Sequence, residues 1–155
     1  GWQHVRSVVL LERRLETQWG RVVDVFQPRL NSLEEVRRET QDEETLNILG
    51  RGKNAYIFAL KNRDPENLAA ADQVTREKLI PAAKREVSVK TYNSIASRYS
   101  RDYGQQVSRT VSTYNLKVLE YYQFAATYHK AMSILRRPRP EWVRIPGYDG
   151  ENEVK

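Results

Sequence analysis

The most constraining feature of this sequence is a strict alternation of three- and four-residue steps between apolar side chains in its last third. Such steps place one side chain per helical turn on the same face, which is typical of a helix packed lengthwise against other helices. We therefore predict a helix-packing seam formed by Val111, Tyr114, Val118, Tyr121, Ala125, Tyr128, Met132 and Leu135.

Helical spacing also runs through the first half of the chain. Apolar residues recur every three or four positions from Val8 to Phe26, and Pro28 predicts that this first helix ends near residue 27. The segments 32–35 and 40–43 both have the form of a capping box. They predict the start of a second helix at Ser32 and a restart near Thr40.

Three further breaks are expected. Asp64 and Pro65 have the residue types of an N-cap and a first helical position, so a helix should start there. Pro81 predicts a kink or a short break, and the segment 100–104 predicts a turn in which Gly104 takes a left-handed conformation.

These elements predict an all-α fold, an antiparallel bundle of four or five long helices with an extended C-terminal arm. The helical bundle domain should span residues 1–137. Residues 138–155 contain three prolines and should form the arm. Trp142, Val143 and Ile145 make this arm apolar enough to dock on its own bundle or on a neighbouring subunit.

The predicted last helix has more apolar surface than one seam needs. A two-stranded coiled coil would leave the additional side chains in water, so we expect them to be buried against several neighbours, within the bundle or between subunits. These additional residues are Leu116, Leu119, Tyr122, Phe124 and Ile134.

No motif indicates catalysis, a metal site or a cofactor. The chain has no cysteine, so disulfides and thiolate chemistry are excluded, and a zinc site would need His4 and His129 together with carboxylates. Gly50 and Gly52 do not form a phosphate-binding loop, because no strand precedes them and no Ser or Thr follows Lys53. We expect instead that these small residues mark a close helix crossing, and that the chain is not an enzyme.

The excess positive charge is concentrated in one segment. Residues 84–139 hold 11 Lys or Arg against 3 Asp or Glu, whereas residues 1–83 hold 13 of each. Such an excess is typical of contact with nucleic acid, anionic lipid or an acidic partner, and the alternative is a solvated helix face. If these cations lie along one side of the structure, polyanion binding is favoured. If they point in different directions, a role in solubility is favoured. The predicted polyanion-binding residues are Arg98, Arg101, Arg109, Lys117, Lys130, Arg136, Arg137 and Arg139.

Tyrosines are interleaved with these cations, as in proteins that stack the bases of single-stranded nucleic acid. Tyr114, Tyr121 and Tyr128 nevertheless fall on the seam, where we expect rings in the core with their hydroxyls bonded.

The sequence resembles the LemA family over roughly residues 9–128. The segment 19–22 is similar to the family's Trp-x-x-Val, and Gln27 and Arg29 stand where it has a Gln-Arg-Arg run. The segment 79–81 with Lys84 resembles its Tyr-Pro-x-x-Lys break. Its closing Tyr-Asn repeat is matched by Tyr114, Asn115, Val118 and Tyr121.

The chain departs from that family at three places. The family's Ile-Pro-Asn-Leu is replaced by the segment 33–36, its His-Glu pair is missing, and its closing Phe-Pro is replaced by Tyr128 and His129. The resemblance implies a helical scaffold domain that often follows a transmembrane helix, with no catalytic residues to transfer.

Together these features predict a non-enzymatic, LemA-like scaffold or assembly protein that acts by helix packing and a basic C-terminal helix. The alternative is a nucleic-acid-binding structural protein, such as a filament or virion coat protein. We expect self-association or another protein partner, with nucleic acid and an anionic membrane surface as alternatives, and no small-molecule substrate. The chain has no apolar stretch of about twenty residues, so it should be soluble as it stands, and an anchor before Gly1 stays open.

Overall fold

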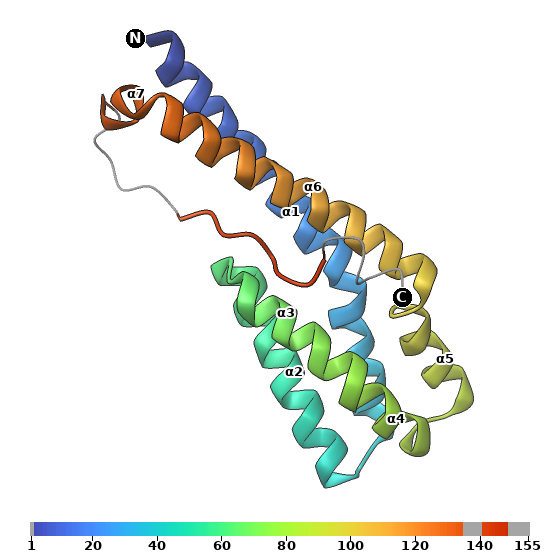
Figure 1. Ribbon diagram of the computed structural model, residues 1–155. Coiled ribbons are helices and arrows are strands. Elements are labelled where there is room, and N and C mark those ends of the chain that lie inside the picture. Colours follow the sequence, from blue (N-terminus) through green and yellow to red (C-terminus); the bar gives the residue numbers. More distant parts are fainter. Residues whose placement is uncertain (1, 135–140, 149–155) are drawn as a thin grey trace.

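The computed structural model describes residues 2–134 and 141–148, and this part of the chain contains helices but no strand (Figure 1). The predicted all-α class is therefore confirmed. Four long helices dominate: α1, α2, the continuous run α3–η1–α4, and α6. In chain order the elements are α1 (Trp2–Glu39), α2 (Glu43–Asn62), α3 (Pro65–Val74), the π-helical segment η1 (Thr75–Leu79), α4 (Ile80–Glu86), α5 (Val89–Ser97), α6 (Arg101–Thr127) and α7 (His129–Ile134).

Helix α1 continues through Pro28, so the predicted end near residue 27 is wrong. An internal proline removes one backbone hydrogen bond and costs about 3 kcal/mol. The apolar face stays in phase across it, because Val22 and Phe26 before the proline and Leu33 and Val36 after it are all fully buried. Burial of four such side chains is worth about 1.5–3 kcal/mol each, which outweighs the lost hydrogen bond.

The start of α2 corrects one capping prediction and supports the other. Ser32 lies inside α1, where its hydroxyl donates to the Pro28 carbonyl at 2.7 Å instead of capping a helix. The restart near Thr40 is observed, with Asp42 as the N-cap whose side chain accepts from the Thr45 N–H at 3.0 Å. The acidic cap also complements the positive N-terminal end of the helix dipole.

The turn between α2 and α3 forms as predicted. Arg63 closes α2 in the left-handed conformation with φ of 51°, Asp64 caps α3, and Pro65 is its first residue. Gly52 of α2 lies close to α3–η1, because a Cβ there would stand 3.2 Å from the Thr75 hydroxyl oxygen. Gly50 faces open space, so only one of the two glycines marks the close crossing.

The segment around Pro81 is a π-helical turn instead of a break. The Ile80 N–H donates to the Thr75 carbonyl, five residues earlier, which widens the helical turn. The next residue, Pro81, has no N–H to donate. The break lies after α4, where Val87 and Ser88 are extended and Ser88 caps α5. Gly104 is a buried residue inside α6 and is not left-handed, so the predicted turn closes at the Ser100 cap instead.

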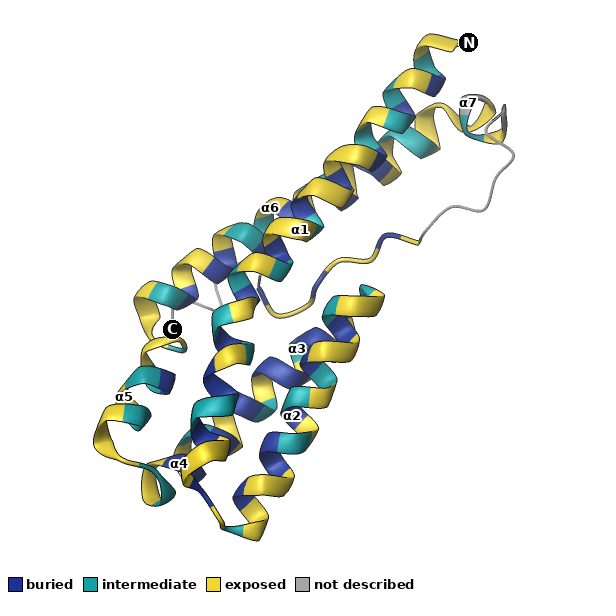
Figure 2. Ribbon diagram, turned by 180° about the vertical axis from the view of Figure 1, so that it is seen from behind, coloured by how far each residue is buried: buried dark blue, intermediate teal, exposed yellow. Residues whose placement is uncertain are grey.

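The helices form two pairs that share one core. Helix α6 lies along α1 and runs in the opposite direction, and α2 lies beside α3–η1–α4 (Figure 1). The lower half of α1 joins the pairs, and buried residues concentrate where helices face one another (Figure 2). The segment 141–148 is not helical and lies between α6 and α3.

The predicted seam of α6 faces α1 over its first half. Val111, Tyr114, Val118 and Tyr121 are buried, and Ala125 is half-buried. Helix α6 ends at Thr127, so Tyr128 leaves the seam and is exposed, while Met132 on α7 is half-buried. Leu135 lies outside the described residues.

The additional apolar residues of this helix do not have the predicted cover. Leu116, Leu119 and Tyr122 are exposed, and Phe124 is half-buried. Leu116 lies on the side of α6 opposite to the buried seam, whereas Phe124 packs on His4 of α1 and the Tyr122 hydroxyl accepts from the Trp142 N–H at 3.2 Å. The side chain of Ile134 lies outside the described part of the structure.

Candidate functional site

A buried carboxylate, Asp72 on α3, is the centre of the largest polar cluster in the described part of the chain. Its two oxygens each accept a hydrogen bond of 2.8 Å from Nη1 of Arg29 on α1. The hydroxyl of Tyr56 on α2 donates to Asp72 at 2.6 Å, and the hydroxyl of Tyr148 donates to the other oxygen. Tyr56 and Tyr99 share a further hydrogen bond of 2.7 Å. We call these five residues the Asp72 cluster.

The Arg29 side chain connects this cluster to α5 and α6. Its Nε donates to the Arg98 carbonyl at 2.7 Å, and its guanidinium lies 4.5 Å from the centre of the Tyr99 ring. Burial disfavours the guanidinium charge, but the Asp72 carboxylate more than offsets this, so the pKa of Arg29 is raised. The charge is therefore held in the core by its partners.

The tyrosines of the cluster are kept protonated. Burial, together with the nearby Asp72 charge, raises the pKa of Tyr56 and Tyr148 well above the usual value, and the pKa of Tyr99 is also raised. Each hydroxyl is thus a hydrogen-bond donor at any physiological pH. Arg76, whose side chain is partly exposed, also donates to Asp72 at 3.2 Å, and Asp72 and Tyr148 line a shallow pocket at the surface. Because its hydrogen bonds join α1, α2, α3, the turn after α5 and the segment 141–148, the cluster serves to hold five parts of the chain together.

The arm, which we define as residues 141–148, is held to α6 by side chains that bond its backbone. Asn115 accepts from the Ile145 N–H at 2.8 Å and donates to the Ile145 carbonyl at 2.9 Å. The Tyr114 hydroxyl donates to the Val143 carbonyl at 2.9 Å. These bonds satisfy backbone groups that no helix or sheet would otherwise pair.

Three arm side chains fill the space between α6 and the α2–α3 pair. Trp142, Ile145 and Tyr148 are buried at intervals of three residues, and the chain turns at Pro146 and Gly147 between the last two. The Arg63 guanidinium covers Trp142 at 3.7 Å from its ring, a cation–π contact. The segment 141–148 therefore packs against helices of its own chain, with Val143 and Pro146 as exposed apolar residues.

The cations predicted to bind a polyanion do not share one stripe. Arg101, Arg109 and Lys117 on α6 are separated by steps of eight residues, and each step turns the helix by about 80° beyond two full turns. Arg98 caps α5 and Lys130 lies on α7. All of these are exposed except Lys117, which is half-buried. Arg136, Arg137 and Arg139 lie outside the described residues.

The tyrosines interleaved with those cations are largely engaged inside the protein. The hydroxyl of Tyr121 donates to Glu12 at 3.3 Å, and the hydroxyl of Tyr103 donates to the Val25 carbonyl at 2.7 Å. Tyr128 stacks on His4 with 4.1 Å between ring centres. A protein that stacks nucleic-acid bases needs aromatic rings with exposed faces. These three tyrosines instead contact other residues of the protein.

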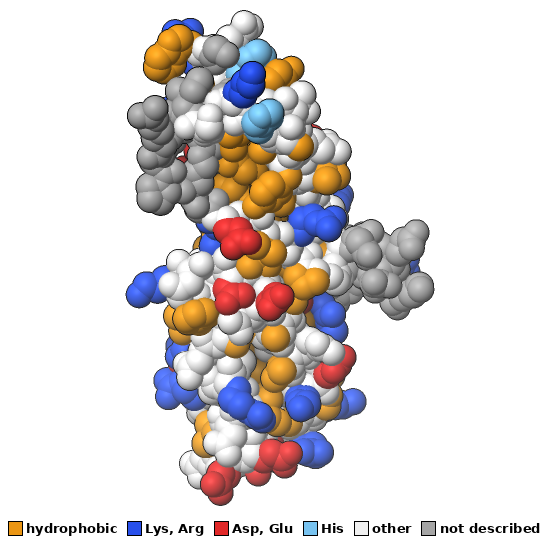
Figure 3. Space-filling model, turned by 60° about the vertical axis from the view of Figure 1, so that its left-hand side comes forward, with side chains coloured by type: hydrophobic (Ala, Val, Ile, Leu, Met, Phe, Trp, Pro, Cys, Tyr) orange, Lys and Arg blue, Asp and Glu red, His pale blue; other side chains and the backbone are white. Residues whose placement is uncertain are grey.

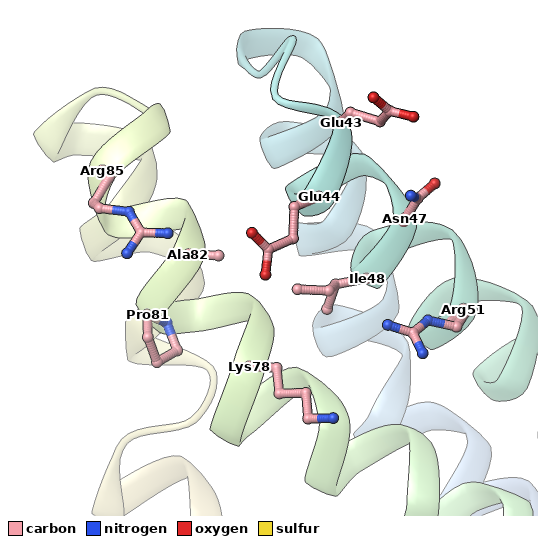
Figure 4. A pocket seen from close by; sticks show the side chains of 9 residues that line it. All are labelled: Glu43, Glu44, Asn47, Ile48, Arg51, Lys78, Pro81, Ala82 and Arg85. Atoms are coloured by element: carbon pink, nitrogen blue, oxygen red, sulfur yellow. The ribbon is translucent and has the colours of Figure 1, made fainter.

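An open groove with a volume of about 750 Å³ lies between α2 and the η1–α4 segment (Figure 4). Arg51 and Lys78 extend into it from opposite walls, and Glu44 and Arg85 point toward each other across it. Ile48 and Ala82 form part of its floor. Figure 3 shows one face of the molecule, and in its lower half Lys and Arg side chains lie beside hydrophobic ones.

This groove continues into a smaller apolar pocket of about 160 Å³ that shares Arg51 and Lys78. Its other lining residues are small, among them Gly52, Ala55 and Ala71. The combined lining carries both signs of charge but no hydroxyl, thiol or imidazole, so it lacks the usual nucleophile–base pair. Such a surface is suited to binding.

The two histidines considered for a zinc site, His4 and His129, lie on α1 and α7. Three or more His, Asp or Glu side chains in ligating positions are found nowhere among residues 2–134 and 141–148. Within the same ranges, none of the helices has the length and hydropathy required to cross a lipid bilayer.

Sequence reasoning missed the Asp72 cluster, although two signals for it are present. Arg29 continues the apolar spacing of Val22 and Phe26, and Asp72 directly follows the buried Ala71. A charged residue in phase with a buried helix face is expected to have a partner in the core. The partners come from other helices and from the arm, so spacing within one helix does not identify them.

Comparison of the chain with protein-family models, with curated proteins and with solved structures gave no match.

Proposed function

We propose that this chain is a non-enzymatic, LemA-like helical scaffold in which one antiparallel bundle is closed by the C-terminal arm and associates with other protein chains, first with copies of itself. The buried polar side chains form hydrogen bonds with one another and stabilise the helix packing. The surfaces that are left open are suited to binding, as expected of a protein that acts by helix packing.

One observation carries this proposal: apolar side chains are exposed side by side on the surface formed by α6 and the arm. Leu116, Leu119, Tyr122 and Val143 are all more than 40% exposed. Leu116, Leu119 and Val143 line one groove of about 570 Å³. Single exposed apolar residues are common, whereas a contiguous group is typical of an interaction site.

The test is the mass of the protein in solution as its concentration is raised. Sedimentation velocity from about 1 to 100 μM covers the range in which moderate-affinity assemblies form. We expect the weight-average mass to rise above that of the 18.2 kDa chain. A mass that stays at the monomer value throughout would contradict self-association.

A second candidate function is a nucleic-acid-binding structural protein, favoured by the exposed arginines of α5 and α6. Arg98, Arg101 and Arg109 have no ion-pair partner among the described residues. A labelled random polynucleotide, titrated beside anionic liposomes at increasing salt, distinguishes the candidates. A steep fall of log affinity with log salt would favour nucleic acid, and the absence of binding at about 100 mM salt to either polyanion would favour the scaffold.

A further inference from the structure

The outward face of α6 combines an apolar centre with two charges of opposite sign. Leu116 is 55% exposed and Leu119 is 43% exposed. Arg109 precedes them and Glu120 follows, and both charged side chains are exposed. We call Arg109, Leu116, Leu119 and Glu120 the outer α6 face.

The two charges lie on one line along the helix. They are eleven residues apart, which is about three full turns with a remainder of roughly 20°, and about 16 Å along the axis. Leu116 lies within roughly 40° of both. In residues 2–134 and 141–148, neither Arg109 nor Glu120 makes an ion pair.

We propose that the outer α6 face is a homodimer interface in which α6 packs against α6 of a second copy, in opposite directions, about a two-fold axis. This inference rests on the proposed function, because it identifies the surface through which the scaffold associates with itself. In a two-fold interface each residue pair occurs twice, so one patch must be complementary to itself.

The outer α6 face meets this requirement. A two-fold axis midway between Arg109 and Glu120 places Arg109 of each copy opposite Glu120 of the other, at both ends of the contact. The two Leu116 side chains then stand about 4.5 Å apart along the helix direction, at the centre. A small crossing angle of about 20°, common between packed helices, keeps both charge pairs within reach.

The groove beside α6 adds apolar area to the same contact. It is lined by Leu116 and Leu119 from α6 and by Val143 and Pro146 from the arm, with Arg144 as its charged residue. A second α6 lying over this groove covers the leucines and the exposed side of the arm together. A partner carrying charge of one sign would instead meet a like charge at one end of the face, and this favours a second copy as the occupant.

Charge reversal tests the arrangement. Arg109→Glu brings four carboxylates to the interface and Glu120→Arg brings four cations, so each single variant should raise the dimer dissociation constant about tenfold or more. The double variant R109E/E120R restores complementarity, and we expect it to return to within about threefold of the wild type. Sedimentation velocity gives the constants, and circular dichroism melting confirms that each variant is folded.

Arg13→Glu and Glu16→Arg, which reverse two exposed charges on α1, are the matched controls. They should leave the dissociation constant unchanged. A wild type that dimerises while both single variants dimerise equally well would overturn the α6 interface and leave the scaffold function standing. If the double variant R109E/E120R dimerises as weakly as the two single variants, the two-fold charge pairing is overturned. A wild type that remains monomeric would overturn this interface and the proposed self-association together.

Discussion

The Asp72 cluster and the outer α6 face both combine opposite charges with apolar or aromatic side chains, but only the first finds its partners within the chain. In the cluster, Asp72 accepts hydrogen bonds from Arg29, Tyr56 and Tyr148, and its side chain is 1% exposed. On the outer α6 face, Arg109 and Glu120 lie about 16 Å apart along the helix and cannot reach each other.

The buried cluster therefore stabilises the fold, whereas the outer α6 face is available to a partner. A buried charge without a partner is strongly unfavourable, so the cluster must be complete in the folded chain. An exposed charge is solvated and tolerates the absence of a partner. Substitutions in the cluster should therefore change the free energy of unfolding, and substitutions on the outer α6 face should change association.

The largest effect is expected from Asp72→Ala. This change leaves the Arg29 guanidinium buried without its carboxylate, which typically destabilises a protein by about 3–5 kcal/mol. Urea unfolding followed by circular dichroism measures the loss. Glu66→Ala, which removes an exposed carboxylate from the same helix, is the control and should change the unfolding free energy by about 0.5 kcal/mol or less. A loss below about 1 kcal/mol for Asp72→Ala would show that the cluster is dispensable.

A second effect is expected on raising the pH, through the buried tyrosines. Burial raises the pKa of Tyr114 to about 12, whereas an unfolded tyrosine titrates near 10. The folded chain therefore binds more protons between these values. The stabilisation is fully present below pH 10 and is lost as the pH rises toward 12, by about 2–3 kcal/mol from Tyr114 alone.

Urea unfolding at several pH values between 8 and 12 measures this loss, with tyrosinate absorbance as an independent record of ionisation. Tyr114→Phe should reduce the pH dependence by the share of Tyr114, while Tyr56, Tyr99 and Tyr148 keep theirs, and Tyr128→Phe, at an exposed position, is the control. An unfolding free energy that is independent of pH up to 12 would contradict the burial of the tyrosine hydroxyls.

A smaller effect is expected from Tyr148→Phe, which removes the arm's hydrogen bond to Asp72 and keeps the ring. A hydrogen bond to a charged group contributes about 1.5–3 kcal/mol, and the other Asp72 partners remain, so we expect a loss near the lower figure. Hydrogen exchange of the Ile145 amide reports arm docking directly, since this amide donates to Asn115. Exchange at the wild-type rate would show that the arm docks without Tyr148.

The smallest effect on stability is expected from Leu116→Ser on the outer α6 face. Because this side chain is already half in water, the unfolding free energy measured below the dimerisation range should change by about 0.5 kcal/mol or less. The dimer dissociation constant should nevertheless rise, since the two copies lose their central apolar contact. A large loss of stability in the isolated chain would mean that Leu116 belongs to the bundle core.

Local sequence signals located most helix ends but not the path of the chain through its prolines. Asp64 and Pro65 start a helix as predicted, because capping depends on the few residues around it. Pro28 does not end a helix, because burial of Leu33 and Val36 beyond it outweighs one missing hydrogen bond. Pro81 is accommodated by a π-helical turn, a result that depends on what α3 and α4 pack against.

The candidate surfaces were predicted less completely than the helices. The positive segment 84–139 is visible in the sequence, yet the arginines on α6 point in different directions because their spacing of eight residues does not fit the helical repeat. Leu116 and Leu119 were expected to be buried and are exposed. A count of apolar residues cannot say whether a neighbouring helix is long enough, or close enough, to cover them.

Residue spacing and composition were enough to predict that this chain is all-helical, that its last long helix carries a packing face, and that its charge is unevenly distributed. These properties follow from spacing and residue type, which act over a few turns of one helix. The contact of Arg29, Asp72 and Tyr148 in the core depends on how the helices pack, and so does the exposure of Arg109 and Glu120. The free energy of a buried charge depends on which distant groups surround it, and only the packing of the whole chain brings those groups together.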